Sequence, residues 1–428
     1  MAPTEIEAPA SIGAGAMPRR AWLILIVIEF LNVVGMTIVI PVLPFITLEY
    51  VSDEAELAWW VGVLEAVFAL CAFLVAPLLG ALSDRFGRRP VLIYSVLGAA
   101  AGYVLFGVGG GLWVLVVARV VQGLASGDMP AIFGYVADIT DEKDRAKRFG
   151  FLGAVGGVGM MVGPAIGGVL AQLDLAAPMF ATAAVAAIVG AISWLVLPES
   201  LAPANRSDGV VLRDLHPVKV LADVFARPAL RPLMVGVALV TLPFVFFVNN
   251  SSVLALDTVG WGPTEFGVLM TVIGLSDIVI QGGLLAILLP RVGERGVVIG
   301  GIVAQAVGCL GLAVAASLLG QVWLFASAAL VFAAGQGSMT AALEGLMSAA
   351  VGPDEQGWLA GSFSALTSAV QIVGPLLGGW AYMTLGRPTI YWAGFLMIVA
   401  AAVVLPRTTA SPPGLARAAA PNSAEPLP

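Results

Sequence analysis

Charged and reactive side chains are scarce in this chain. Charged residues make up 11% of its 428 residues and hydrophobic residues 59%, whereas about 25% of the residues in soluble domains are charged. The chain has one histidine, His216, and two cysteines, Cys71 and Cys309, which lie far apart within apolar segments. This composition predicts no disulfide, no metal site and no catalytic cluster, and it is typical of a membrane protein.

Long apolar runs, in contrast, are abundant. A run of about 20 apolar residues can cross the hydrocarbon core of a lipid bilayer as a helix. The sequence therefore predicts an all-α polytopic membrane protein with twelve transmembrane helices: 21–43, 58–79, 91–109, 112–136, 149–171, 178–197, 232–254, 265–289, 297–317, 321–345, 358–384 and 389–405.

Positive charge is confined to one side of this predicted topology. Of the 20 Lys and Arg residues, all but Arg119 and Arg387 lie in segments that share that side. Because cytoplasmic loops carry an excess of Lys and Arg, we expect a protein of the inner (plasma) membrane with both termini in the cytoplasm. Residues 1–20 lack the apolar core of a signal peptide, and residues 406–428 have the composition of a disordered tail.

The sequence contains an internal duplication. "VGPAIGG" at 162–168 recurs as "VGPLLGG" at 373–379, and "RFGRRPVLI" at 85–93 recurs as "RVGERGVVI" at 291–299. Two parallel six-helix repeats with a substrate site near the membrane midplane between them are a transporter architecture. The predicted parts are a cytoplasmic tail at 1–20, a six-helix half at 21–197, a cytoplasmic central loop at 198–231, a six-helix half at 232–405 and a cytoplasmic tail at 406–428.

Three motifs resemble signatures of the major facilitator superfamily: "GALSDRFGRRPVLI" at 80–93, "ARVVQGLASG" at 118–127 and "GVGMMVGPAIGGVL" at 157–170. With "DIT" at 138–140 and "GER" at 293–295, the chain is similar to twelve-helix drug:proton antiporters of the tetracycline-resistance type. The resemblance implies a monomeric transporter without a cofactor, not an enzyme, which exports a small amphipathic molecule, tetracycline-like or cationic, in exchange for protons. It implies no nucleic-acid partner.

Other functions fit the same fold. Import or symport of a small metabolite and export of an endogenous natural product both remain open, although the third motif resembles an antiporter signature. A membrane enzyme or sensor would need a catalytic cluster or a soluble output domain, and the sequence indicates neither.

The first motif is predicted to lie in the loop between the second and third helices. Gly80 and Gly87 would allow a tight turn, and Asp84 would accept hydrogen bonds at a neighbouring helix N-terminus. The resemblance implies a conformational latch that stabilises the outward-facing state, whereas the arginines could instead only orient the chain. The predicted latch residues are Gly80, Asp84, Arg85, Gly87, Arg88, Arg89 and Asp138.

The third motif places small residues on one face of the fifth helix. Gly159, Gly163 and Gly167 are spaced by four, Pro164 adds a kink, and Gly168 is the last residue of "VGPAIGG" within the motif. The resemblance implies that this stripe packs against the eighth helix and seals the cavity. Ordinary packing of small residues would look the same in the sequence.

Ionisable side chains within the predicted spans point to function, because each is costly in a membrane and normally faces a cavity or a partner. They are Glu29, Glu65, Arg119 and Asp277. We expect Arg119 to pair with Glu29, and we expect the excess of acids either to bind a cation or to stay partly protonated. Neutralised acids that serve only helix packing are the alternative.

Asp277 is predicted to carry the proton, since its own helix contains no Lys or Arg. Polar residues on the faces of the central helices are the predicted substrate-binding residues: Asn32, Gln122, Asn249, Gln281 and Gln336. The chain departs from the tetracycline exporters at Gly102 and Gln305, where that group has acids. This departure makes tetracycline itself a less certain substrate.

Overall fold

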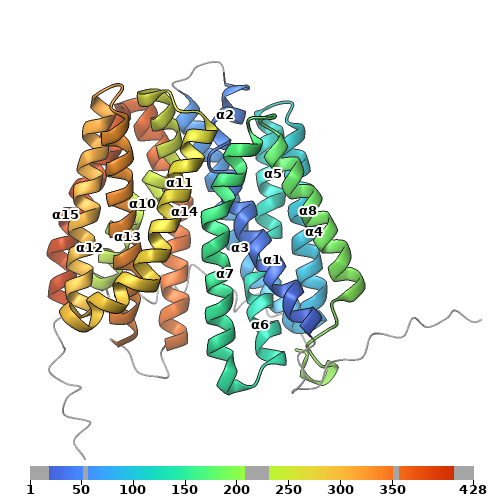
Figure 1. The fold of residues 1–428 in the computed structure, drawn as a ribbon. Coiled ribbons are helices and arrows are strands. Elements are labelled where there is room, and N and C mark those ends of the chain that lie inside the picture. The colour runs from blue at the N-terminus through green and yellow to red at the C-terminus, as the bar shows by residue number, and fades with distance from the viewer. Residues whose placement is uncertain (1–18, 52–55, 208–230, 350–355, 409–428) are drawn as a thin grey trace, which may run out of the picture.

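The computed structural model describes residues 19–51, 56–207, 231–349 and 356–408, and these form an almost entirely helical bundle (Figure 1). His216 and most of the predicted tails and central loop lie outside the described residues. The first half comprises α1 (Arg19–Ile38), α2 (Leu43–Leu48), α3 (Leu57–Phe86), α4 (Arg88–Val108), α5 (Leu112–Ala125), α6 (Met129–Ile139), α7 (Glu142–Leu170) and α8 (Ala177–Val196).

The second half begins after the 3-10 turn η2 (Pro203–Asn205). It comprises α10 (Arg231–Val259), α11 (Pro263–Val279), the π-helical segment η4 (Ile280–Leu284), α12 (Leu285–Ser317), α13 (Val322–Ala349), α14 (Gln356–Leu385) and α15 (Arg387–Thr408).

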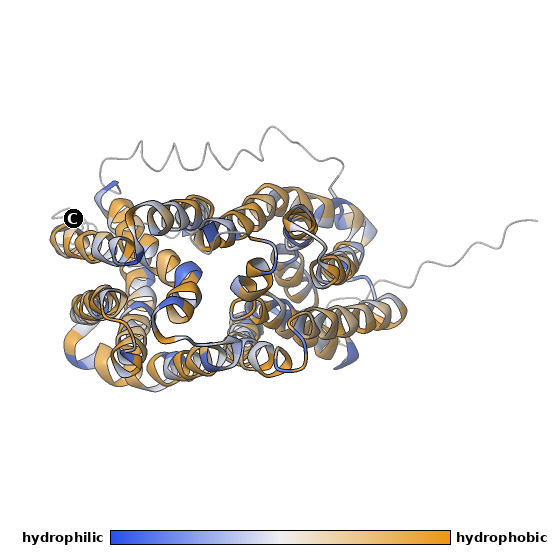
Figure 2. Cartoon of the chain, turned by 90° about the horizontal axis from the view of Figure 1, so that it is seen from above, coloured by the Kyte–Doolittle hydropathy of each residue, from blue (hydrophilic) through white to orange (hydrophobic). Residues whose placement is uncertain are grey.

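The twelve predicted spans are confirmed. Within the described residues, eleven helical segments are long and apolar enough to cross a membrane. One of them, Pro263–Ser317, is 55 residues long and turns back at Gly293, whose φ of 69° is favourable for glycine, so it supplies two spans. Figure 2 shows the two halves side by side, with hydrophobic residues over most of the helix surfaces.

Two predicted helices are divided. The predicted 21–43 ends as α1 at Ile38, and a turn precedes α2, because Pro41 and Pro44 have no N–H to continue the helix. The predicted 112–136 is interrupted between α5 and α6 at residues 126–128, just before Pro130. The second break lies inside one candidate span, Leu112–Ile139.

The two ends of the bundle differ in charge. We call the end at which α1 begins and at which α3 meets α4 the basic end, since Arg88, Lys143 and Arg291 lie there. The other is the opposite end.

Among the described residues, the buried apolar side chains of the two halves share one cluster. One cluster contains residues of both halves, and its first-half members, such as Ile38, Leu57 and Phe106, lie towards the opposite end. A second cluster lies towards the basic end and contains only first-half residues, among them Leu25 and Tyr135. The hydrophobic core therefore holds the halves together at the opposite end.

Candidate functional site

An ion pair is buried in the first half, between α5 and α3. The Arg119 guanidinium donates to the Glu65 carboxylate and, at 3.2 Å, to Oε1 of Gln122. It also lies over the rings of Phe68 and Phe106, at 5.5 and 5.4 Å from their centroids. Arg119 is only 3% exposed, so its charge is balanced by an acid within the protein.

The predicted Arg119–Glu29 pair is wrong. Glu29 of α1 is 3% exposed, its Oε2 has no hydrogen-bond partner, and its Oε1 faces Gly156 of α7. The charge that acts on its carboxyl is that of Asp128, another acid. Helical spacing identified the inward face of α1 but not its rotation relative to α5, and Glu65 on α3 occupies the position beside Arg119.

Asp128 was missed by the sequence analysis. It lies at the break between α5 and α6, is 4% exposed, and accepts a hydrogen bond from Nδ2 of Asn32. A signal was present, because an acid followed by Met-Pro is typical of the residue before a helix start. The signal was overlooked because a continuous helix was predicted over 112–136.

Asp277 lies apart from these groups, on α11 of the second half. Its carboxylate rests against Gly337 of α13, where an added Cβ would overlap Oδ1, and that oxygen has no hydrogen-bond partner. Among the described residues no ion pair involves Asp277.

The predicted substrate-binding residues do not form one group. Asn32 donates to Asp128 and Gln122 accepts from Arg119. Asn249 donates to the Val245 carbonyl of its own helix at 2.8 Å, and Gln281 is exposed within η4. Gln336 accepts from Nε2 of Gln305 at 2.6 Å and donates to Thr340 at 3.2 Å. The first two adjoin the buried charges of the first half, and Gln336 forms a separate polar row on α12 and α13.

Both departures from the tetracycline-exporter pattern have structural counterparts. At Gly102 a Cβ would lie 2.5 Å from Cγ of Gln122, so α4 packs too closely on α5 for a carboxylate. Gln305 is fully buried and donates to the Val240 carbonyl at 3.1 Å as well as to Gln336. Amides and glycine fill the places where an acid was expected.

The glycine stripe on α7 does not contact the eighth span as predicted. Cβ atoms at Gly159, Gly163 and Gly167 would collide with residues of α1, such as Val33 at 3.1 Å from Gly159. The spacing of four correctly identified a smooth face, but this face packs within its own half. The stripe lets α1, which carries Glu29, approach α7 closely.

The end of the same motif contacts the second half. A Cβ at Gly168 would lie 2.7 Å from the Pro263 carbonyl of α11, and one at Gly267 would lie 2.6 Å from the Pro164 carbonyl. Thr264 donates to the Gly168 carbonyl at 2.8 Å. We call this contact of α7 with α11 the first seam.

The second copy of the motif makes the equivalent contact. Cβ atoms would overlap the Pro375 carbonyl at Gly62 of α3 and the Ala58 carbonyl at Gly379 of α14. We call this contact of α14 with α3 the second seam. Each "VGPxxGG" copy thus joins its own half to the second span of the other half, near the opposite end.

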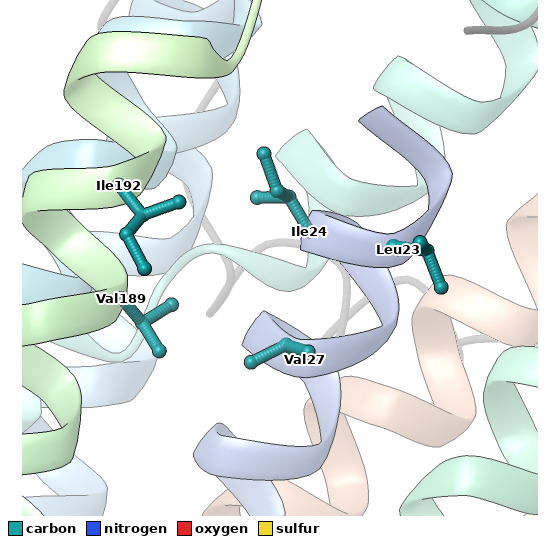
Figure 3. Close-up of a pocket in the computed structure, with 5 residues that line it drawn as sticks. All are labelled: Leu23, Ile24, Val27, Val189 and Ile192. Atoms are coloured by element: carbon teal, nitrogen blue, oxygen red, sulfur yellow. The ribbon is translucent and has the colours of Figure 1, made fainter. Parts of the chain in front are cut away.

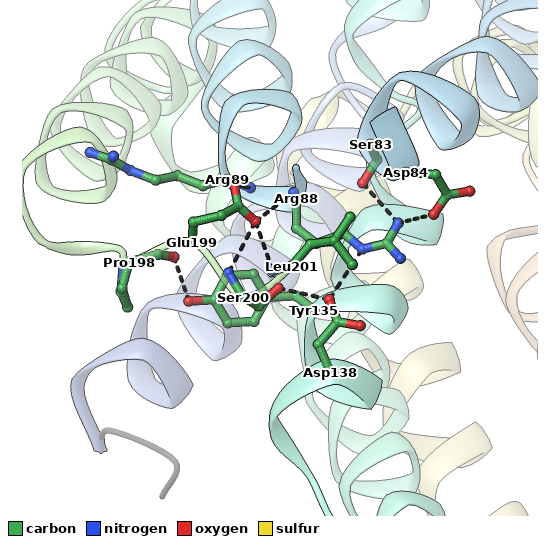
Figure 4. A network of polar contacts seen from close by, with 10 residues as sticks. All are labelled: Ser83, Asp84, Arg88, Arg89, Tyr135, Asp138, Pro198, Glu199, Ser200 and Leu201. Atoms are coloured by element: carbon green, nitrogen blue, oxygen red, sulfur yellow. Dashed lines mark hydrogen bonds and ion pairs between the residues drawn. The ribbon is translucent and has the colours of Figure 1, made fainter. Parts of the chain in front are cut away.

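The first motif forms a polar network at the basic end (Figure 4). Arg88 donates to Asp84 at 2.5 Å, to Asp138 at 3.3 Å and to Ser83 at 3.2 Å. Gly87 makes the predicted turn with φ 108°, but Gly80 lies inside α3. These ion pairs all stay within the first half.

The carboxylate at the helix N-terminus is Glu199, not Asp84 as predicted. Glu199 follows α8 and accepts from the backbone N–H groups of Arg88 at 2.9 Å and Arg89 at 3.3 Å, at the start of α4 (Figure 4). Asp84 is 56% exposed and bonds through its side chain to Arg88. Arg85 lies over the ring of Phe86 and Arg89 donates to the Trp194 carbonyl, so Arg88 alone of the three arginines reaches an acid of another helix.

One groove is formed by apolar side chains on the outside of the first half. Leu23, Ile24 and Val27 of α1 face Val189 and Ile192 of α8 around a space of about 140 Å³ (Figure 3). Its lining has no polar group, so this groove resembles a surface for lipid chains and not the polar site.

Known proteins are similar to this chain over almost its whole length. The model of the Major Facilitator Superfamily matches residues 25–357 and, in a second match, 244–427. The tetracycline resistance protein, class C, of Escherichia coli is 35% identical over 381 residues, which cover 88% of this chain and 92% of that protein. The class H protein of Pasteurella multocida is 31% identical over 387 residues, covering 90% and 93%.

A solved structure supports the fold independently. The crystal structure of the human organic anion transporter MFSD10 (TETRAN) matches with a TM-score of 0.64 at 20% identity. The match covers 91% of this chain and all of that one.

Proposed function

This chain belongs to the major facilitator superfamily, and we propose that it exports a small amphipathic, drug-like molecule across the plasma membrane in exchange for protons. The observation that carries this proposal is the set of ionisable side chains buried within the spans: Arg119 with Glu65, Glu29 with Asp128, and Asp277. Charged groups at this depth are costly and are kept for ion or substrate pathways. Relatives at more than 30% identity are tetracycline resistance proteins, which supports export.

Alternating access follows from the way the halves are joined. The two seams lie near the opposite end, whereas the ion pairs of Arg88 at the basic end stay within one half. By the positive-inside rule the basic end faces the cytoplasm, with both termini. The structure then represents the inward-facing state, in which the first motif is released, and closure at the basic end would open the seams.

The substrate class follows from the buried charges. Acids outnumber the single base, Arg119, among the ionisable side chains listed above, and this favours a cationic or metal-chelated drug. Gly102 and Gln305 replace acids of the tetracycline exporters, so tetracycline is the first compound to test and other amphipathic cations follow. The protein would act as a monomer, since each half supplies its partner within one chain.

A drug-susceptibility panel tests this function. The chain is expressed in a strain that lacks its own efflux pumps, beside the Asp84→Asn variant at equal membrane abundance. Export predicts that the wild type raises the inhibitory concentration of tetracycline or of at least one amphipathic cation, and that the variant does so much less. Equal susceptibility of the wild type and the empty strain to every compound would argue for import or another function.

A further inference from the structure

Two carboxyls of the first half, Glu29 and Asp128, form no ion pair with any described residue. Glu29 and Asp128 are 3% and 4% exposed. Asn32, one turn from Glu29 on α1, donates to Asp128, so the two carboxyls lie close together, and the charge of Asp128 acts on Glu29. Arg119 lies in the same span as Asp128, but it is already paired with Glu65. Two ionised carboxylates that lie close together in a buried site repel each other, so such a pair holds a proton.

The surroundings of Glu29 supply no charge that would replace this proton. From α7 the neighbouring residue is Gly156, which carries no charge and leaves room for the carboxyl. Among the described residues no ion pair involves Glu29, and the charge that acts on its carboxyl is that of Asp128. Oε2 of Glu29 has no hydrogen-bond partner although the residue is almost fully buried, so this oxygen is free to carry a proton.

Asn32 distinguishes the two carboxyls. Its amide Nδ2 donates to Oδ2 of Asp128, and a hydrogen bond of this kind stabilises a carboxylate. Asn32 is one turn from Glu29 on α1, so one helix places both the donor to Asp128 and the second acid. The arrangement favours an ionised Asp128 beside a protonated Glu29.

We infer that Glu29 and Asp128 together form one proton-binding site that shares a single exchangeable proton, oriented by Asn32. The pair takes one proton from water, which changes its charge from −2 to −1, and returns it to water, so no other reactant is needed. The inference rests on the proposed proton-coupled export, because it names a proton-binding site in the first half, in addition to Asp277 in the second half. It concerns residues outside the first and third motifs.

Infrared difference spectroscopy tests the site without a substrate. The purified, membrane-reconstituted protein is titrated while the stretching band of protonated buried carboxyls is followed. The wild type is expected to show a band that the double variant Glu29→Gln/Asp128→Asn lacks. In Asp128→Asn the pH of half-protonation of Glu29 is expected to fall by about one unit or more, since the repulsion is gone.

A second variant acts in the opposite direction and keeps both acids. Asn32→Ala removes the donor to Asp128, so the pair should hold its proton to a higher pH than the wild type does. Asp141→Asn, which removes an exposed acid at the basic end, is the matched control and should leave the band unchanged. Thermal unfolding of each variant confirms that it is folded.

The outcomes separate this inference from the proposed function. If Asp128→Asn and Asn32→Ala both leave the half-protonation of Glu29 unchanged, the shared site is refuted, even where proton-driven drug export is observed. Opposite shifts in the two variants support the site, even if no tested drug is transported and the proposed function fails.

Discussion

Arg119 of α5 donates a hydrogen bond to the carboxylate of Glu65 on α3, and the two side chains are 4% and 25% exposed. The guanidinium also lies over two phenyl rings. The pair therefore fixes the approach of two helices in the first half.

Removing one partner of this pair should destabilise the protein. Breaking a buried ion pair lowers the free energy of unfolding by about 3–5 kcal/mol. For Glu65→Gln we expect a loss at the lower end of this range, because Glu65 is partly exposed. The double change Arg119→Ala/Glu65→Gln should cost less than the sum of the single changes in thermal unfolding. The combination of Arg119→Ala with Glu29→Gln is the control and should be additive, whereas strong coupling there would restore the Arg119–Glu29 pair.

The seams should not tolerate a methyl group. Gly168→Ala and Gly379→Ala place a Cβ against the backbone of the other half, and such overpacking costs about 1–3 kcal/mol. Because the cost falls only on the state with closed seams, we expect transport to drop about tenfold or more at normal membrane abundance.

The matched controls for the seams lie on the same two helices. Cβ atoms at Gly153 of α7 and Gly361 of α14 would meet nothing within 4 Å, so Gly153→Ala and Gly361→Ala should transport at the wild-type rate. A labelling rate of Thr264→Cys that rises in the Gly168→Ala background would show that the first seam has opened. Equal transport in all four alanine variants would contradict the role of the seams.

Asp84→Asn should separate conformational control from stability. Asp84 is mostly exposed and pairs with Arg88 four residues on, and such pairs contribute about 0.3–0.5 kcal/mol. We expect an unfolding temperature close to that of the wild type together with a sharp loss of transport. Glu199→Ala is the contrast, since it removes the acceptor at the start of α4 and should lower the unfolding temperature. Efflux at the wild-type rate by Asp84→Asn would show that Asp84 is not part of a conformational latch.

Asp277→Asn imitates a permanently protonated carboxyl. We expect this variant to exchange substrate at equal pH but to lose uptake driven by a proton gradient, because Asp277 forms no ion pair with any described residue. The check is paired exchange and gradient-driven assays in vesicles, with Glu29→Gln as the companion variant. If Asp277→Asn retains the wild-type ratio of protons to substrate, Asp277 is a packing residue beside Gly337 and coupling belongs to the first half.

The sequence predicted the spans well because membrane crossing depends on length and apolar composition, which are local properties. The repeat of "VGPxxGG" also predicted the two-fold arrangement, and its two copies make matching seams. What a helical face touches is not local. The stripe at Gly159 packs on α1, not on the eighth span, because spacing gives the face and not the neighbour.

The sequence identified most residues of the candidate site but not which of them contact one another. Glu29 and Arg119 are buried and Glu65 is partly buried, but the partner of Arg119 depends on how α1 and α3 are rotated about their axes. Asp128 could be recognised only from the break between α5 and α6, and hydropathy does not reveal this break. Glu199 was overlooked because its role depends on the folding of the segment after α8 back onto α4.

Proton-driven export is tested most directly in inside-out membrane vesicles. Their interior is acidified, and accumulation of tetracycline, or of the compound identified by susceptibility, is followed before and after an ionophore collapses the gradient. The account predicts uptake that depends on the acid interior, disappears with the ionophore, and releases protons in step with substrate entry. Uptake only when the exterior is the more acidic side, or uptake indifferent to the gradient, would contradict it.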